Sequence, residues 1–204
     1  MKKGIAIIGL ATVIIAAYFL FFNKTQSEPE TAAAEPHVST AESKNSSTFN
    51  TAFEGALNNY YAIKDALVNW DTAAAATAAN NLQRSLSAVP FDELGNDSTI
   101  SRAENVSGQI VGETEGFLSE KSIDGQRHSF YALSEQLYNL VKTVHYDRQV
   151  IYHAKCPMAF NNEQDEGWWI SNKNEVINPY FGTKHPRYKN AMLNCGSVED
   201  SVTN

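Results

Sequence analysis

The residues best suited to chemistry lie in the last quarter of the chain. Both cysteines, Cys156 and Cys195, are there, together with Met158 and Met192, the only methionines besides the initiator. Thiolate and thioether sulfurs are soft donors that select ions such as Cu(I). The Cys156–Met158 and Met192–Cys195 pairs could converge to supply two to four sulfur donors. We therefore expect a Cu(I) or Ag(I) site in this region.

Two histidines are weaker candidates for the same site. His153 lies three residues before Cys156, and His128 falls near the start of the last expected helix. Imidazole nitrogen is a common copper ligand. Both residues also fit a plain structural interpretation, with His128 packed or capping a helix and His153 on the surface.

The same two cysteines allow a simpler alternative. Two cysteines in an exported protein commonly form a disulfide. A Cys156–Cys195 bond would contribute roughly 4 kcal/mol in the chain-entropy model, and Met158 and Met192 would then be flexible packing residues. Metal site and disulfide both stay open, and they can be two redox states of one place.

The N-terminus gives the reason to expect export. Residues 4–22 are apolar and carry no charge, and a helix needs about 20 apolar residues to cross a bilayer. Lys2 and Lys3 precede them, so the positive-inside rule keeps the N-terminus in the cytoplasm. We expect residues 1–22 to form a single-pass inner-membrane anchor, with the C-terminal domain in the periplasm. A cleaved signal segment and an exported protein are the alternative.

Composition divides the rest of the chain into three parts. Residues 23–48 are too polar to fold alone and are expected to be a disordered linker. Residues 49–147 carry apolar residues every three or four positions, typical of buried helix faces. Four such stripes with short connections favour an up-down-up-down four-helix bundle. The first stripe is Phe53, Leu57, Tyr60, Ile63, Leu67 and Trp70, and Asp71 is the expected N-cap of the next helix.

After position 147 the helical period stops. Residues 150–152 and 168–170 have the pattern of short strands, and proline and glycine divide the remainder. We therefore expect a mostly α protein in which residues 148–204 form a small irregular α+β region with the Cys and Met residues. A region of this size has little core of its own, so it needs docking, a cross-link or a metal.

Charge and missing motifs exclude other classes. The formal net charge is −7, and no basic cluster occurs beyond the extreme N-terminus, which argues against a nucleic-acid partner. The chain contains no Gly-x-Ser-x-Gly, no phosphate-binding glycine loop and no His-Glu-x-x-His, so we expect no enzyme activity. The absence of Glu-x-x-His on the expected helices also argues against a di-iron bundle.

Short motifs between about residues 50 and 200 carry a further signal. They include Tyr60-Tyr61, Arg127-His128, Cys156-Pro157-Met158-Ala159, Trp169-Ile170-Ser171, Asn178-Pro179-Tyr180-Phe181-Gly182 and Met192-Leu193-x-Cys195-Gly196. Together they resemble a family of domains of unknown function from Bacteroidetes-type bacteria. That family occurs alone or fused to periplasmic adaptor subunits of heavy-metal efflux pumps. The chain departs from the family pattern by inserting residues 183–190.

The resemblance implies an exported accessory domain that serves copper or silver homeostasis, with an efflux component as partner. The competing expectation is a non-metal periplasmic interaction or scaffold domain stapled by a disulfide. The expected metal ligands are Cys156, Met158, Met192 and Cys195. His128 and His153 are weaker candidates.

Overall fold

The structure is a computed structural model that describes residues 43–160 and 164–203. The expected membrane segment at residues 4–22 and most of the expected linker lie outside these ranges. Within them, no helix combines the length and the apolar character that a membrane span requires.

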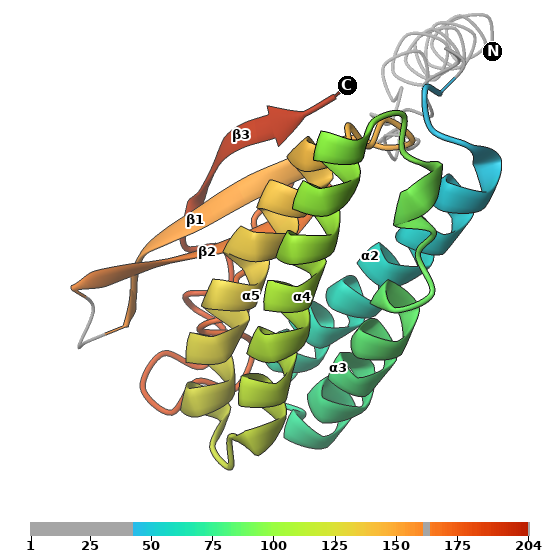
Figure 1. Ribbon diagram of the computed structural model, residues 1–204. Coiled ribbons are helices and arrows are strands. Elements are labelled where there is room, and N and C mark those ends of the chain that lie inside the picture. The colour runs from blue at the N-terminus through green and yellow to red at the C-terminus, as the bar shows by residue number, and fades with distance from the viewer. Residues whose placement is uncertain (1–42, 161–163, 204) are drawn as a thin grey trace, which may run out of the picture. The chain divides into compact units, whose positions relative to one another are not determined.

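Four helices form two antiparallel pairs. Helix α2 (Ser47–Val68) packs beside α3 (Thr72–Leu86), and α4 (Asp97–Ser119) packs beside α5 (Ile123–Thr143). A short 3₁₀ turn, η1 (Phe91–Glu93), connects the pairs, and α3 lies next to α4 (Figure 1). The prediction of four helices in up-down pairs is confirmed.

Side-chain caps fix where the helices begin. Ser46 accepts a hydrogen bond from the Phe49 amide at 3.0 Å, so α2 starts inside the range expected to be linker. Asp71 accepts from the Ala74 amide at 2.8 Å, as predicted for the N-cap of α3. Asn96 caps α4 in the same way, through the Thr99 amide at 2.9 Å. Each cap satisfies an amide that the first helical turn leaves unpaired.

Helix α2 ends in a turn that aims Trp70 at the C-terminal region. The Asp71 amide bonds to the Ala66 carbonyl at 2.9 Å and the Trp70 amide to the Leu67 carbonyl at 3.2 Å, the two bonds of a Schellman motif. Trp70 occupies the left-handed position, with φ 60°, which is strained for a residue other than glycine. Its indole Nε1 donates to the Phe181 carbonyl at 2.8 Å, and this contact helps to offset the strain.

The C-terminal region is built on a three-stranded antiparallel sheet with the order β2-β1-β3. The strands are β1 (Ile151–Phe160), β2 (Asp165–Ser171) and β3 (Ser197–Val202). The strand expected at residues 150–152 is only the start of β1, the strand expected at 168–170 lies within β2, and β3 was not predicted. Pro157 falls in the irregular stretch of β1 between Cys156 and Phe160, where a missing amide breaks no ladder bond.

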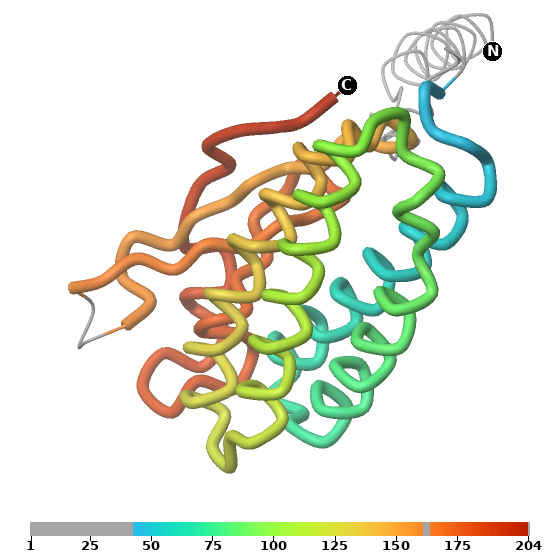
Figure 2. The backbone as a smooth tube through the Cα atoms, viewed as in Figure 1, coloured from blue at the N-terminus to red at the C-terminus, as the bar shows by residue number. Residues whose placement is uncertain are grey.

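A long turn-rich segment joins β2 to β3. Figure 2 shows the chain leaving β2, running as loops along the lower half of α5 and returning to the sheet as β3. Between β2 and β3 the structure assigns no helix or strand, only turns and a single bridge between His185 and Lys189. This segment carries the expected Met192 and Cys195.

Tyrosine hydroxyls join the outer edge of β2 to α2 and to the turn-rich segment. The Tyr60 hydroxyl accepts from the Ile170 amide at 3.0 Å and lies 2.7 Å from the Ser134 hydroxyl of α5. The Tyr180 hydroxyl donates to the Trp168 carbonyl. An edge strand otherwise exposes unpaired amides and carbonyls. The sheet is therefore joined to the helices by hydrogen bonds as well as by apolar packing.

Helices and sheet bury one shared core. Tyr60 of α2 stacks on Phe130 of α5 at 5.1 Å, and Trp169 of β2 packs against Tyr180 at 5.9 Å. All four rings are buried. The C-terminal region thus obtains by docking the core that its own length does not supply.

Gly182 lies where the turn-rich segment passes close to the end of α2. Its φ is +59°, and a Cβ there would lie 2.4 Å from the Val68 carbonyl oxygen and 2.9 Å from Trp70 Nε1. We expect Gly182→Ala to lower the free energy of unfolding by about 3 kcal/mol, measured by urea denaturation. Gly112→Ala is the control, because no atom beyond its chain neighbours and the nearby backbone of its own helix lies within 4 Å of the added methyl, and the helix should gain about 0.5–1 kcal/mol. A Gly182→Ala protein as stable as wild type would contradict this account of the turn.

Candidate functional site

The structure brings the two cysteines together. Cys156 is fully buried near the middle of β1, and Cys195 is half-buried at the end of the turn-rich segment. Their sulfur atoms lie 3.8 Å apart, although the residues are 39 positions apart in the chain. We refer to Cys156 and Cys195 as the thiol pair.

Strand pairing positions Cys195 against β1. Lys155 pairs with Ser197 and Ala154 with Val198, so the chain enters β3 directly beside Cys156. Gly196 makes this approach possible, because a Cβ at its position would lie 2.3 Å from the Lys155 carbonyl oxygen. Its φ of +132° is also a conformation that favours glycine.

Asn178 holds the turns around the thiol pair and is fully buried. Its side-chain amide donates to the Cys195 carbonyl at 2.7 Å, and its own backbone amide bonds to the Leu193 carbonyl at 2.8 Å. Its side-chain oxygen accepts from the Tyr180 amide at 2.8 Å. In the sequence, only the Asn178-Pro179 turn signal pointed to this residue. Its role in holding the turns around the thiol pair was not predicted.

Burial controls the protonation of Cys156. Loss of solvent raises the pKa of the Cys156 thiol to about 11, and hydrogen bonds from the Met158 backbone and the Asn178 side chain oppose the rise. The neighbouring Cys195 adds to it. Cys156 is therefore a neutral thiol at pH 7, with two donors in place to stabilise its thiolate once the proton leaves.

The sulfur separation suits two kinds of chemistry. If both sulfurs bound one ion at about 2.3 Å, their 3.8 Å separation would subtend an angle of about 110° at the ion. A disulfide instead requires the sulfurs to close to about 2.05 Å. Shared ligation of a soft ion fits the observed separation with little movement, and oxidation requires the two sulfur atoms to move closer.

The other predicted ligands lie in different surroundings. Met192 is half-buried in the turn that ends at Cys195, where its carbonyl accepts from the Cys195 amide at 3.0 Å. Met158 lines a pocket together with His128, and His128 stacks on Phe160 at 4.1 Å. His128 is exposed on α5 apart from this ring contact.

His153 occupies a different environment from the one expected. It is buried, and its Nε2 lies 2.8 Å from a Glu135 carboxylate oxygen. Its ring lies between Tyr138 at 3.9 Å and Trp168 at 4.4 Å. The interpretation of His153 as a surface residue is wrong, because Glu135 and Tyr138 of α5 and Trp168 of β2 cover its ring. Across residues 43–160 and 164–203, no three His, Cys, Asp or Glu side chains gather as a metal site.

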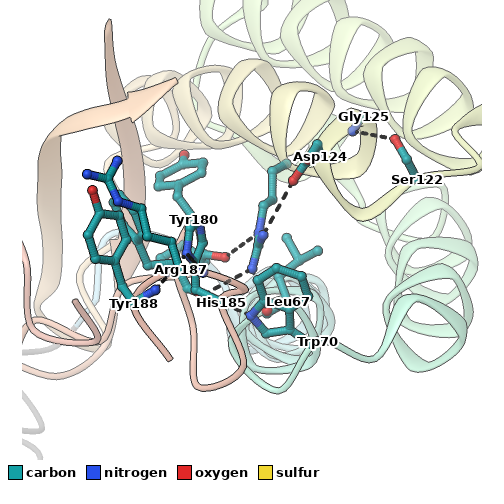
Figure 3. A network of polar contacts seen from close by, with 12 residues as sticks. Leu67, Trp70, Ser122, Asp124, Gly125, Tyr180, His185, Arg187 and Tyr188 are labelled. Atoms are coloured by element: carbon teal, nitrogen blue, oxygen red, sulfur yellow. Dashed lines mark hydrogen bonds and ion pairs between the residues drawn. The ribbon is translucent and has the colours of Figure 1, made fainter. Parts of the chain in front are cut away.

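Arg127 of α5 fastens the turn-rich segment to the helices. Its guanidinium donates to the carbonyls of Pro179 at 3.0 Å and of Leu67 and Phe181 at 3.4 Å each. It also lies over the Trp70 ring at 4.2 Å. Figure 3 shows Leu67 and Trp70 beside this network. The sequence pointed to Arg127 only as part of the Arg127-His128 motif, because nothing in it showed that the side chain is buried.

The surroundings keep Arg127 charged. Burial lowers its pKa to about 10, and the Asp124 carboxylate, 3.6 Å away, opposes the change. The Leu67 carbonyl belongs to the last turn of α2, where the helix dipole favours a cation. Arg127 is thus a buried cation held mainly by carbonyl oxygens at a helix end.

These features define a helical domain with an attached antiparallel sheet and a two-cysteine site. Residues 56–149 match the sequence model of a family described as "Protein of unknown function (DUF3347)". The match covers just under half of the chain and ends before β1, so both cysteines and both candidate methionines lie beyond it. Neither the curated proteins nor the solved structures contain a match to this chain.

Proposed function

We propose that this protein binds one soft metal ion, Cu(I) or Ag(I), through Cys156 and Cys195. The observation that carries the proposal is the 3.8 Å separation of the two sulfur atoms. Soft ions prefer thiolate ligands, and shared ligation needs almost no rearrangement of the pair. Met192, in the turn that ends at Cys195, is the first candidate for an additional sulfur donor, whereas Met158 lines a separate pocket.

The surroundings of the thiol pair support metal binding. Asn178 and the Met158 amide donate toward the Cys156 sulfur, and such hydrogen bonds around metal ligands orient them and tune the metal. The apolar setting also limits access of water and oxidants. Cys195 is half-exposed and gives the ion a route to the site.

The biological setting is part of the proposal. The motif resemblance, together with an anchor at residues 4–22, suggests a periplasmic accessory domain attached to the inner membrane. Its role would be to hold Cu(I) or Ag(I) and pass it to a heavy-metal efflux component. The protein would have no enzyme activity.

Competition for Cu(I) tests this function. The full-length chain, purified reduced and without oxygen, is titrated against a coloured Cu(I) chelator. We expect it to withdraw one Cu(I) per chain, with X-ray absorption showing two sulfur neighbours at about 2.3 Å. Failure to take Cu(I) from the chelator, or a first shell without sulfur, would rule the function out.

The second candidate is a non-metal scaffold domain stapled by a Cys156–Cys195 disulfide, which the same sulfur proximity favours. Protein isolated without reductant is unfolded and its thiols are counted. Unfolding is needed because the neutral, buried Cys156 thiol reacts too slowly in the native state. A count of zero free thiols supports the disulfide, and a count of two free thiols per chain excludes it.

A further inference from the structure

Trp169 of β2 lies on the face of the sheet that carries Cys156. Cys156 pairs with Gly167, and Ala154 pairs with Trp169. Successive side chains of a strand point to opposite faces, so Cys156 and Trp169 are diagonal neighbours on one face. Such neighbours lie about 7–8 Å apart along the backbone, within reach of an aromatic side chain. The indole is therefore long enough to reach the thiol pair.

The indole of Trp169 extends across β1 toward Cys195. Figure 1 shows β1 between β2 and β3, in agreement with the strand order. The Trp169 Cη2 atom nevertheless lies 3.3 Å from the position that a Cβ of Gly196 would occupy. Gly196 directly follows Cys195 and precedes β3. The ring thus spans from β2 to the residue after Cys195, next to both segments that carry the thiols.

Packing alone does not explain a tryptophan at this position. Trp169 is fully buried, and its Nε1 has no hydrogen-bond partner among residues 43–160 and 164–203. Buried indole N–H groups usually find an acceptor, and leaving one unpaired is unfavourable. Phenylalanine would provide an aromatic ring here without burying an unpaired donor. The larger π-face of the indole is the property that distinguishes Trp169 from such a replacement.

The thiol pair by itself leaves one side of a bound ion open. Two sulfurs 3.8 Å apart hold an ion in a bent arrangement. No cluster of three or more His, Cys, Asp or Glu side chains occurs in the described parts of the chain. The Tyr180 ring fills the space beside Gly167, the residue opposite Cys156, where an added Cβ would lie 2.7 Å from Tyr180 Cε2. The thiol pair is thus bordered by aromatic rings.

The neighbouring Trp168 provides the contrast. It pairs with Lys155 on the opposite face of the sheet. Its ring lies 4.4 Å from the His153 ring and 5.1 Å from the Lys155 ammonium nitrogen. Trp168 therefore faces away from the thiol pair and serves as the matched control for Trp169.

We propose that Trp169 contacts the soft ion bound by Cys156 and Cys195, with the π-face of its indole covering the side that the two sulfurs leave open. The proposal rests on the metal-binding function proposed above and adds a contact from β2 to that site. Cations are attracted to the faces of aromatic rings, most strongly to that of tryptophan, and the attraction grows when water is excluded. The ring thus helps a site with two thiols to hold a monovalent ion.

Tryptophan fluorescence of the reduced full-length chain tests the contact, with Ag(I) as the probe and its uptake measured in parallel. One equivalent of Ag(I) is expected to change the emission. Trp70→Phe and Trp168→Phe should retain that change, and Trp169→Phe should lose most of it. Uptake of Ag(I) with unchanged emission, or with a change that Trp168→Phe abolishes, would overturn the contact and leave the proposed function standing. No uptake of Ag(I) would overturn both.

Affinities of matched variants show whether the ring itself matters. Trp169→Leu is expected to weaken Ag(I) binding about tenfold, and Trp169→Phe, which keeps a π-face, by no more than about threefold. Trp168→Leu should stay within about twofold of wild type. Wild-type affinity in Trp169→Leu, or equal losses in Trp169→Leu and Trp169→Phe, would overturn the proposal. The emission of Trp70→Phe and Trp168→Phe decides the question even if the buried Trp169 does not tolerate replacement, because both variants keep it.

Discussion

Replacing Cys195 with serine is expected to weaken Cu(I) binding by more than about a hundredfold. Loss of a residue that merely supports a ligand costs about 10–100-fold in affinity, so loss of one of two thiolates must cost more. Cys195 is the better position to change because it is half-exposed, whereas Cys156 is fully buried in the shared core. The Cu(I) chelator competition measures the effect directly.

Two controls separate ligation from damage to the fold. Urea denaturation should show that Cys195→Ser changes the free energy of unfolding of the reduced protein by less than about 1 kcal/mol. Met192→Leu keeps the volume of the same turn and removes its thioether, so it reports whether Met192 is a further donor. Wild-type affinity in Cys195→Ser would exclude shared ligation by the thiol pair.

Arg127→Ala is expected to lower the free energy of unfolding by about 4 kcal/mol. The change removes three hydrogen bonds to carbonyl oxygens and the contact with the Trp70 ring. The Pro179 carbonyl loses its guanidinium partner, and a cavity opens among buried groups. Urea denaturation of both proteins gives the difference.

The size of the loss should depend on the guanidinium. Arg127→Lys keeps the charge but cannot span three carbonyls, so we expect roughly half of the destabilisation. Arg102→Ala, on the exposed face of α4, should change the free energy of unfolding by no more than about 0.5 kcal/mol. Arg127→Ala within 1 kcal/mol of wild type would contradict the role of Arg127 in holding the turn-rich segment.

Local rules explain why the helical part could be predicted. The stripe from Phe53 to Leu67 is buried along one face of α2, because helical spacing alone decides which side chains share a face. The Asp71 cap followed from the same short-range reasoning. These features depend on neighbours within four residues, which a sequence displays directly.

Long-range contacts explain what could not be predicted. The polar residues of β3 carry no strand signal, and the strand forms because β1 offers an edge for pairing. Histidine is often found at the surface, but His153 is covered by Glu135 and Tyr138 of α5. Propensity contains no information about such partners.

The candidate site was predicted only in part for the same reason. Residue type singled out Cys156 and Cys195, because few residue types offer sulfur, and the structure places their sulfur atoms 3.8 Å apart. Residue type did not show that Met158 points instead into a pocket with His128. Nor did it show that Asn178 and Gly196 set the distance between the thiols. Convergence of ligands is a property of the fold.

The contact between Trp70 and Phe181 joins residues that are 111 positions apart, and this separation bears on the order of folding. Contacts between distant residues pay a large loop-closure cost and form slowly, whereas helical hairpins such as α2–α3 and α4–α5 form from local contacts. The helices should therefore assemble first and provide the surface onto which the turn-rich segment docks. Until then the chain carries two separate thiols, so the capacity of Cys156 and Cys195 to share an ion or a bond is acquired in the last step of folding.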